Sequence, residues 1–223
     1  MKTSLRAIFF DIGGTLIHPW PSVGEIYAST ARRHGLNVTA GQIENAFRES
    51  WVALKRPGMT VSRKEWWRAL VFRTLGQENE ACFEELYERF GHAAAWRVYP
   101  DVEDTLRDVR ARGLRVGAIS NWDERLRPLL GELGLVARFD SITVSCEVGA
   151  EKPVATVFQA ALRAAGVAAV EAIHIGDSHE EDVRGGQAAG LRAVLVKRDG
   201  GDAQECASIR DLREVVKIVS AQA

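Results

Sequence analysis

The stretch LRAIFFDIGGTL, residues 5–16, determines how the rest of the sequence is interpreted. Its first half, residues 5–10, is a short apolar run of the kind that forms a buried parallel strand. An acidic residue, Asp11, and two glycines follow close behind, as in a strand that ends in a loop at its carboxyl end. The stretch therefore predicts either a reactive carboxylate or a glycine turn that holds a phosphate group.

Similar apolar runs recur along the chain and alternate with helical patterns. The further expected strands cover residues 114–120, 140–145, 171–176 and 191–196. Helical patterns that end in glycine, as helix C-termini commonly do, cover residues 101–113, 156–166 and 180–190. This alternation predicts an α/β fold, a Rossmann-like parallel sheet with helices on both faces.

Residues 20–96 interrupt the alternation, because they contain no comparable β run. They offer instead four helical segments, near 23–34, 40–54, 62–75 and 79–90. We therefore expect an all-helical cap domain over residues 19–96, inserted into an α/β core of residues 1–18 and 97–223. Five of the six tryptophans fall in or beside the insertion, and we expect them to pack its core: Trp20, Trp51, Trp66, Trp67 and Trp96.

The composition argues against several classes of partner. Lys plus Arg (29) nearly balances Asp plus Glu (30), and no run of like charges suggests binding to nucleic acid or to a membrane surface. The first apolar run is too short for a signal sequence or a membrane span. Three scattered cysteines, without zinc-ligand spacing, are typical of a reducing cytosol: Cys82, Cys146 and Cys206. We expect a cytoplasmic protein, a monomer or weak homodimer, that acts on a small molecule.

Polar side chains gather where the expected strands end. In an open parallel sheet, ligands bind beyond the carboxyl ends of the strands. The residues expected there are Asp11, Ser120, Asn121, Lys152, Asp177 and Asp182. Carboxylates at one edge suit Mg²⁺, and an ammonium with a hydroxyl suits the oxygens of a phosphate group.

Four motifs in order resemble the haloacid dehalogenase-like hydrolase superfamily along the whole chain. The first is DxxGT, from Asp11 to Thr15, and the second is a Ser-Asn pair that follows an apolar run and begins at Ser120. The third is Lys-Pro, beginning at Lys152, and the fourth is GDxxxxD, whose two aspartates are Asp177 and Asp182. The helical insertion lies where the first type of cap domain lies in that family. The stretch WPSVGEIYASTARRHGL, residues 20–36, and the pair Trp66-Trp67 further resemble the subgroup called haloacid dehalogenase-like hydrolase domain-containing protein three.

The resemblance implies a role for each residue. Asp11 would be a nucleophile that forms an aspartyl-phosphate. Mg²⁺ would be held by Asp11, the backbone carbonyl of Gly13 and Asp177, with Asp182 as a further ligand or as a support behind the ligands. Ser120 would bond a phosphoryl oxygen, Lys152 would neutralise the charge, and Thr15 would complete the cradle. Asn121 would either bind the phosphate or hold its own loop. The cap would close over the site and select the substrate.

The sequence departs from the family pattern at Gly13. Phosphatases of the family usually carry a second Asp there, which protonates the leaving group, and such a general acid is typically worth about 10²- to 10⁴-fold in rate. Several alternatives stay open. The substrate could have a good leaving group, as in an acyl phosphate, or another residue could supply the proton: His18, His179 or Glu180.

Hydrolysis of a bond to carbon is a further alternative. It could be phosphonate hydrolysis through a Schiff base on Lys55 or Lys64, or it could be 2-haloacid dehalogenation. A catalytically impaired binding protein is another. The two histidines within the insertion, His34 and His92, are expected to be surface or packing residues.

The DIGGT segment is also similar to the first phosphate loop of actin-related sugar kinases. Such folds need a second phosphate loop and a glycine-rich adenosine motif, and the sequence contains neither, nor a P-loop. The sequence thus favours a Mg²⁺-dependent, phosphatase-type hydrolase of weak or narrow activity.

Overall fold

The protein forms two compact units. The computed structural model describes residues 4–54, 63–198, 200 and 206–220. The first unit contains the described residues of Met1–Ile17, Val98–Glu124 and Gly134–Ala223. The second contains the described residues of His18–Arg97 and Arg125–Leu133.

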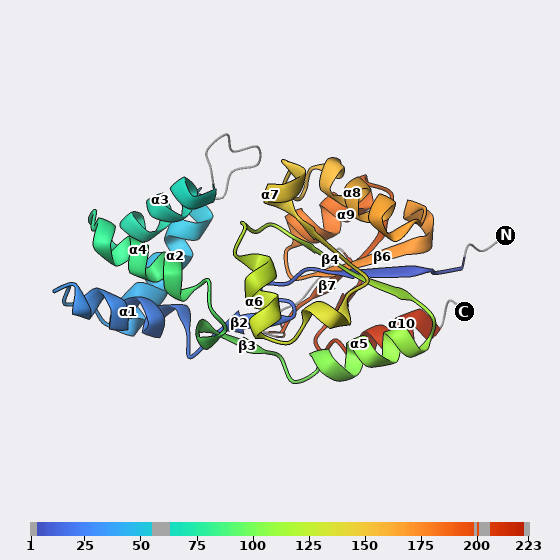
Figure 1. The fold of residues 1–223 in the computed structure, drawn as a ribbon, viewed down its shortest axis with the longest axis horizontal. Helices are drawn as coiled ribbons and strands as arrows, with labels where there is room; N and C mark the ends of the chain where they lie inside the picture. Colours follow the sequence, from blue (N-terminus) through green and yellow to red (C-terminus); the bar gives the residue numbers. More distant parts are fainter. Residues whose placement is uncertain (1–3, 55–62, 199, 201–205, 221–223) are drawn as a thin grey trace. The chain divides into compact units, whose positions relative to one another are not determined.

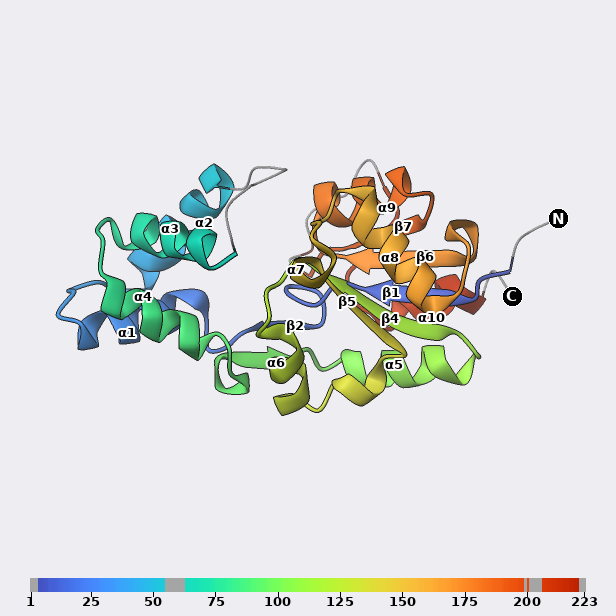
Figure 2. The same ribbon diagram turned by 45° about the horizontal axis from the view of Figure 1, so that its top comes forward.

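A six-stranded parallel sheet forms the centre of the first unit (Figures 1 and 2). The strand order is β5-β4-β1-β6-β7-β8, so the first strand of the chain lies between β4 and β6. Both β1 and β6 are buried along their whole length, as expected for a parallel sheet covered on both faces. The strands are β1 (Ala7–Phe10), β4 (Arg115–Ser120), β5 (Ser141–Val144), β6 (Ala172–Gly176), β7 (Arg192–Val196) and β8 (Ser208–Ile209).

The predicted α/β fold is confirmed, and the first five strands of the sheet lie within the five apolar runs of the sequence. The sixth strand, β8, was not predicted. It has two residues, Ser208 and Ile209, and only Ile209 is buried, so the sequence contains no apolar run that would predict this strand.

Helices cover both faces of this sheet. Figures 1 and 2 show α8 (Ala155–Ala165) and α9 (Gly185–Ala188) on one side, and α5 (Val102–Ala111) and α10 (Glu214–Ser220) on the other. Helix α8 buries an apolar stripe at helical spacing and ends at Gly166, whose left-handed φ of 61° suits glycine. The remaining short elements are η2 (Val136–Arg138), α7 (Ser145–Val148) and η3 (Ala169–Glu171).

The predicted helix over residues 180–190 is wrong in detail. The segment forms a π-helix, η4 (His179–Arg184), followed by the single turn of α9. Side-chain hydrogen bonds shape its wide first turn, because Ser178 N donates to Oδ2 of Asp182 and Glu181 N donates to Oγ of Ser178. Turns of this kind occur frequently at functional sites.

The second unit is mainly helical. Its helices are α1 (Val23–Arg33), α2 (Ala40–Leu54), α3 (Arg63–Leu75), α4 (Glu80–Arg89), η1 (Ala93–Ala95) and α6 (Leu126–Glu132). The first four confirm the helical segments that the sequence predicts, although Ser62, the expected start of the third, lies outside the described residues. Two short strands, β2 (Ile17–Pro19) and β3 (Trp96–Val98), pair at the points where the chain passes between the units, and the sequence did not predict them.

Aromatic side chains pack inside the second unit. The ring centroid of Trp66 lies 5.1 Å from that of Trp51 and 5.2 Å from that of Trp67. Both Trp66 and Trp96 are buried, as expected for core residues. The expectation is wrong for Trp20, which is 45% exposed because its ring lies at the surface between His18 and Arg97.

The three cysteines have free thiols, and Cys82 is buried while Cys146 is exposed. Both histidines of the insertion pair with glutamates, His34 with Glu85 and His92 with Glu88 and Glu132. No helix within the described ranges is both long and apolar enough to cross a membrane.

Candidate active site

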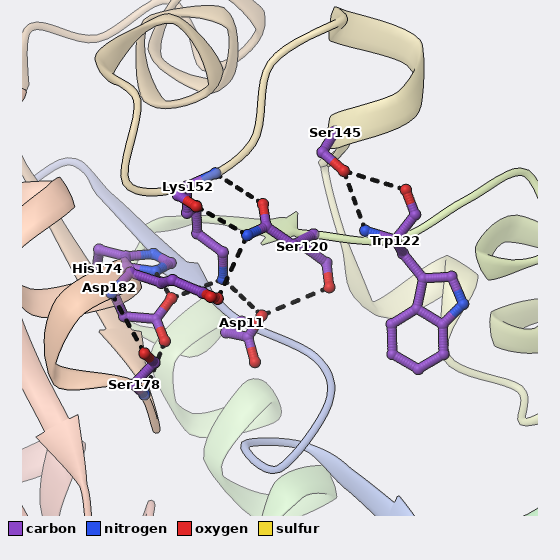
Figure 3. A network of polar contacts seen from close by, with 10 residues as sticks. Asp11, Ser120, Trp122, Ser145, Lys152, His174, Ser178 and Asp182 are labelled. Atoms are coloured by element: carbon purple, nitrogen blue, oxygen red, sulfur yellow. Dashed lines mark hydrogen bonds and ion pairs between the residues drawn. The ribbon is translucent and has the colours of Figure 1, made fainter. Parts of the chain in front are cut away.

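The predicted polar residues of the first unit meet at the carboxyl edge of its sheet. Asp11 follows β1 directly, Ser120 ends β4, and Asp177 follows β6. Because β1 lies between β4 and β6, Asp11 is central among them. Its backbone N–H donates to the carbonyl of Ile175 at 2.8 Å, which ties the loop to β6. Figure 3 shows the side chains of Ser120, Lys152, Asp182 and His174 around Asp11.

Lys152 joins two of the carboxylates. Its Nζ donates to Oδ1 of Asp11 and to Oδ1 of Asp182, both at 2.6 Å, and its side chain is 1% exposed. Burial alone would lower the pKa of Lys152, but the charges of Asp11 and Asp182 outweigh it and raise that pKa above its usual range. The lysine is therefore a fixed, buried cation between two anions.

Asp11 and Asp182 respond differently to this shared lysine. Burial raises the pKa of Asp11 more than Lys152 lowers it, and the nearby charge of Asp182 adds to the rise. Burial also acts to raise the pKa of Asp182, but Lys152 and His174 together hold it well below its usual range. Asp182 is thus the more firmly charged carboxylate of the two.

Most of the hydrogen-bonding capacity of Asp182 is already in use. Its Oδ1 lies 2.6 Å from Nζ of Lys152 and 2.8 Å from Nε2 of His174, and its Oδ2 accepts from Ser178 N at 2.9 Å. The carboxyl group packs against Gly176, where a Cβ would lie 2.1 Å from Cγ of Asp182. Of the two roles predicted for Asp182, these contacts favour a support behind the ligands over a further metal ligand.

His174 is part of this network, and sequence reasoning missed it. It lies on β6 with no exposed surface, and its ring packs edge-on against Phe158 at a centroid distance of 5.3 Å. Its Nδ1 is buried and has no hydrogen-bond partner among the described residues. The available signal was a single imidazole inside the otherwise apolar strand AIHIG.

Ser120 and Asn121 have different tasks. The hydroxyl of Ser120 lies 3.4 Å from Oδ1 of Asp11, a long contact that keeps it beside the nucleophile candidate. Both ends of the Asn121 amide bind the backbone of Lys152: Oδ1 accepts from Lys152 N at 2.7 Å, and Nδ2 donates to Lys152 O at 2.9 Å. Of the alternatives for Asn121, the geometry supports holding the loop.

The loop after Asp11 adds a buried hydroxyl and a close backbone approach. Thr15 is fully buried, and its Oγ1 has no hydrogen-bond partner among the described residues. Gly14 has a φ of 82°, and a Cβ there would lie 2.3 Å from Oδ2 of Asp177. Only glycine suits this position, where the loop backbone approaches the carboxyl group of Asp177 closely.

The carboxylates form a candidate metal site. Asp11, Asp177 and Asp182 each offer an oxygen, and these oxygens lie within 4.8 Å of one another. Asp177 is exposed as a residue, yet withdrawal of its carboxyl from water, followed by the charges of Asp11 and Asp182, raises its pKa to about 8. Without a cation, the neighbouring carboxyl groups of Asp11 and Asp182 thus oppose ionisation of Asp177. The oxygen donors of the cluster fit a hard cation such as Mg²⁺, which would favour the ionised carboxylates.

A tryptophan outside the motifs lies against Gly13. A Cβ at Gly13 would meet Cζ3 of Trp122 at 3.0 Å, so the indole stands where a side chain of residue 13 would project. Trp122 is the one tryptophan that lies away from the helical insertion in the sequence.

The residues named as substitutes for the missing acid, and the lysine named for a Schiff base that the structure describes, have other contacts. Nδ1 of His18 lies 3.1 Å from the carbonyl of Pro19, and Glu180 pairs with Arg184 at the surface beside the exposed His179. Lys64 pairs with Glu84 at 2.8 Å, and Lys55 lies outside the described residues. These contacts favour neither a substitute acid at His18 or Glu180 nor a Schiff base at Lys64.

Comparisons with known proteins point in one direction. A family model described as haloacid dehalogenase-like hydrolase matches residues 5–190. The chain is similar to the human haloacid dehalogenase-like hydrolase domain-containing protein 3, with 36% identity over 87% of this chain and 83% of the relative. It is 30% identical to a phosphoserine phosphatase of Thermus thermophilus, over 95% of this chain and 98% of the relative. The crystal structure of a HAD phosphatase from Thermococcus onnurineus superposes with a TM-score of 0.73 at 27% identity, over 98% and 99% of the two chains.

Proposed function

This chain belongs to the haloacid dehalogenase-like hydrolase family, and from that premise we propose that it is a Mg²⁺-dependent phosphatase of small phosphorylated metabolites. The nucleophile is Asp11. The similarity to a phosphoserine phosphatase supports the reaction class. Three free thiols agree with action in the cytoplasm, where thiols stay reduced, and we propose a monomer or weak homodimer.

One observation carries the proposal: a buried lysine binds the nucleophile candidate beside an acidic cluster. Nζ of Lys152 lies 2.6 Å from Oδ1 of Asp11, and carboxyl oxygens of Asp11, Asp177 and Asp182 lie within 4.8 Å of one another. A phosphoryl group needs cations around its oxygens, while the attacking carboxylate must itself stay ionised. Lys152 supplies one such cation, and its charge acts against the rise that burial causes in the pKa of Asp11.

In the first step Asp11 takes the phosphoryl group. The hydrogen bonds from Lys152 and Ser120 both go to Oδ1 of Asp11, and we therefore assign the attack to Oδ2. A bond forms between Oδ2 and phosphorus, and the bond to the leaving oxygen breaks with its electron pair on that oxygen. Ser120 donates to a phosphoryl oxygen, and the buried Thr15 hydroxyl and the loop amides line the cradle.

Mg²⁺ would be held by Asp11, Asp177 and the Gly13 carbonyl, and when bound it supplies positive charge that draws the dianionic phosphate to Asp11. Asp182 holds Lys152 in place from behind. Asn121 holds the backbone of the same lysine. The two residues together fix the direction of the ammonium group toward Asp11.

In the second step water cleaves the aspartyl-phosphate. Oxygen of water bonds to phosphorus, the bond from phosphorus to Oδ2 breaks, and free phosphate leaves with Asp11 restored. A general base normally assists this step and a general acid the first, but Gly13 can serve as neither. The first step is therefore slow for substrates whose leaving oxygen needs a proton, and the second step is slow for every substrate because the aspartyl-phosphate is common to all of them. The result is weak or narrow activity.

We assign substrate choice to the helical insertion, residues 19–96, as the cap of a core made of residues 1–18 and 97–223. Lids of this kind exclude water from the reacting groups and complete the pocket. The aromatic cluster of the second unit gives this cap a rigid interior.

The test is a phosphate-release screen over phosphomonoesters, acyl phosphates and phosphonates, with Mg²⁺ and with EDTA. Wild type, Asp11→Asn and Asp104→Asn are compared, because Asp104 is a half-exposed aspartate on α5 that controls for the loss of a charge. We expect release by wild type and Asp104→Asn with Mg²⁺ only, and none by Asp11→Asn.

Phosphate release by the Asp11→Asn variant would refute the assignment of Asp11 as the nucleophile. Halide release from 2-haloacids in EDTA would favour the dehalogenase alternative. Absence of turnover by every variant on every substrate would favour a binding protein built on this fold.

A further inference from the structure

The indole of Trp122 fills the space above Gly13. A Cβ at residue 13 would lie 3.0 Å from Cζ3, 3.8 Å from Cη2 and 4.0 Å from Cε3. The two flanking carbons stand behind Cζ3, so the ring directs its benzenoid C–H edge at Gly13 rather than its face. Contact at 3.0 Å is tighter than side chains ordinarily tolerate, and a longer side chain at residue 13 would run into the ring.

The backbone at Gly13 does not itself require glycine. Its φ is not among the positive values that occur at nearby Gly14 and at other glycines of the chain. A Cβ at Gly14 would meet the Asp177 carboxylate, whereas the three nearest atoms that a Cβ at Gly13 would meet among the described residues, its chain neighbours aside, all belong to Trp122. The side chain of Trp122 is therefore what restricts residue 13.

Trp122 is held firmly by its backbone. Its N–H donates to Oγ of Ser145 at 3.1 Å, its carbonyl accepts from that hydroxyl at 3.1 Å, and Cys146 N donates to the same carbonyl. Ser145 is 2% exposed and begins α7 directly after β5. Figure 3 shows this clamp beside Ser120 and Asp11. The loop between the ends of β4 and β5 thus fixes the tryptophan next to the reacting groups.

We propose that Trp122 determines the leaving-group specificity of this enzyme, an inference that rests on the proposed phosphatase function. The indole occupies the place of the missing acid and forms an apolar wall on the side where the leaving oxygen departs. The edge of an aromatic ring is electropositive but carries no transferable proton. The leaving oxygen must depart as an anion, so the substrate class is the phosphates of acidic hydroxyls: acyl, enol and aryl phosphates.

The chemistry predicts a pairwise dependence between residues 13 and 122. A carboxylic acid introduced by Gly13→Asp cannot reach the leaving oxygen while the indole occupies its path. Removal of the indole alone makes room but supplies no proton. Only both changes together restore the acid that hydrolysis of an alkyl phosphate requires.

The test measures kcat/KM for an alkyl phosphate and for aryl phosphates of graded leaving-group pKa. The variants are Gly13→Asp, Trp122→Ala, their combination, and Trp20→Ala as an exposed tryptophan control. We expect Gly13→Asp to raise alkyl phosphate hydrolysis at least about tenfold more in the Trp122→Ala background than in the Trp122 background, a part of the about 10²- to 10⁴-fold that a positioned general acid typically supplies. The combination should also flatten the dependence on leaving-group pKa. Equal gains in both backgrounds would overturn the proposal.

A second measurement does not depend on turnover. Gly13→Ala is made with and without Trp122→Ala, and urea unfolding gives the stability of the four proteins. We expect Gly13→Ala to destabilise the protein when Trp122 is present and to be less harmful when it is absent.

Additive effects would show that the contact is absent and would overturn the inference while phosphate release stands. If the two substitutions are coupled in stability but no activated phosphate is hydrolysed, the contact between Trp122 and residue 13 is real and the phosphatase function is refuted. The leaving-group specificity, which rests on that function, is then refuted as well.

Discussion

The ammonium group of Lys152 donates to Oδ1 of Asp11 at a distance of 2.6 Å, with both side chains buried. A lysine in this position opposes the effect of burial on the pKa of Asp11, the proposed nucleophile, and orients its carboxyl group before any substrate arrives. It also means that the stability of the core and the reactivity of the site depend on the same cation, because Asp182 shares it.

Lys152→Met should therefore damage folding and activity together. It leaves two carboxylates, Asp11 and Asp182, buried without their cation, and breaking a buried ion pair in this way costs about 3–5 kcal/mol. Urea unfolding and phosphate release are the measurements. The double variant Lys152→Met with Asp11→Asn should recover part of the stability and none of the activity. A stable and active Lys152→Met would contradict the role assigned to this lysine.

Asn121→Ala should lower kcat with little effect on the folding of the sheet. The amide of Asn121 holds both backbone groups of Lys152, and a misplacement of about 1 Å in a catalytic group can cost about 10²-fold in rate. Asn121→Asp keeps the acceptor for Lys152 N but loses the donor, so it should lie between wild type and Asn121→Ala. If Asn121 binds phosphate instead, the change will appear in KM rather than in kcat.

The stability of the helical unit should fall as the pH rises through neutrality. Hydrogen bonds to Glu88 and then Glu132 raise the pKa of His92 above its ordinary value. A raised pKa in the folded state stabilises the fold fully below the unfolded value of about 6.5, and this contribution disappears as the pH rises through the folded value.

The test is urea unfolding of wild type and His92→Gln at about pH 6, below the ordinary pKa of histidine, and at about pH 8.5, well above it. Wild type should lose more stability between the two conditions than His92→Gln. Equal losses would show that His92 makes no such contribution. The hydrogen bond from Ala93 N to Glu132 does not titrate in this range and is common to both proteins.

The sequence predicted the elements whose patterns are local. Five strands and the four helices of the insertion follow from apolar runs and helical spacing, and the motif residues Asp11, Ser120, Lys152, Asp177 and Asp182 meet because parallel strands end at one edge. The strands β2, β3 and β8 were missed because two or three residues carry no period.

Features that depend on particular side-chain contacts could not be predicted from sequence patterns. The π-helix follows from side-chain bonds among Ser178, Glu181 and Asp182, which no periodicity reveals. The contact between Trp122 and Gly13 joins two positions that are far apart in the sequence. From the sequence, Gly13 indicated only the absence of the usual general acid. The structure adds that the indole of Trp122 fills the space that a side chain at residue 13 would occupy.

The central claim is that Asp11 takes the phosphoryl group and that Gly13 assists neither its transfer nor its release. The most direct measurement mixes wild type with Mg²⁺ and an acyl phosphate, quenches in acid, reduces with borohydride and examines the peptide that contains Asp11 by mass spectrometry. Because no general base speeds the second step, the aspartyl-phosphate should accumulate and residue 11 should be recovered as homoserine. Phosphate release with residue 11 unmodified throughout the time course would contradict the account.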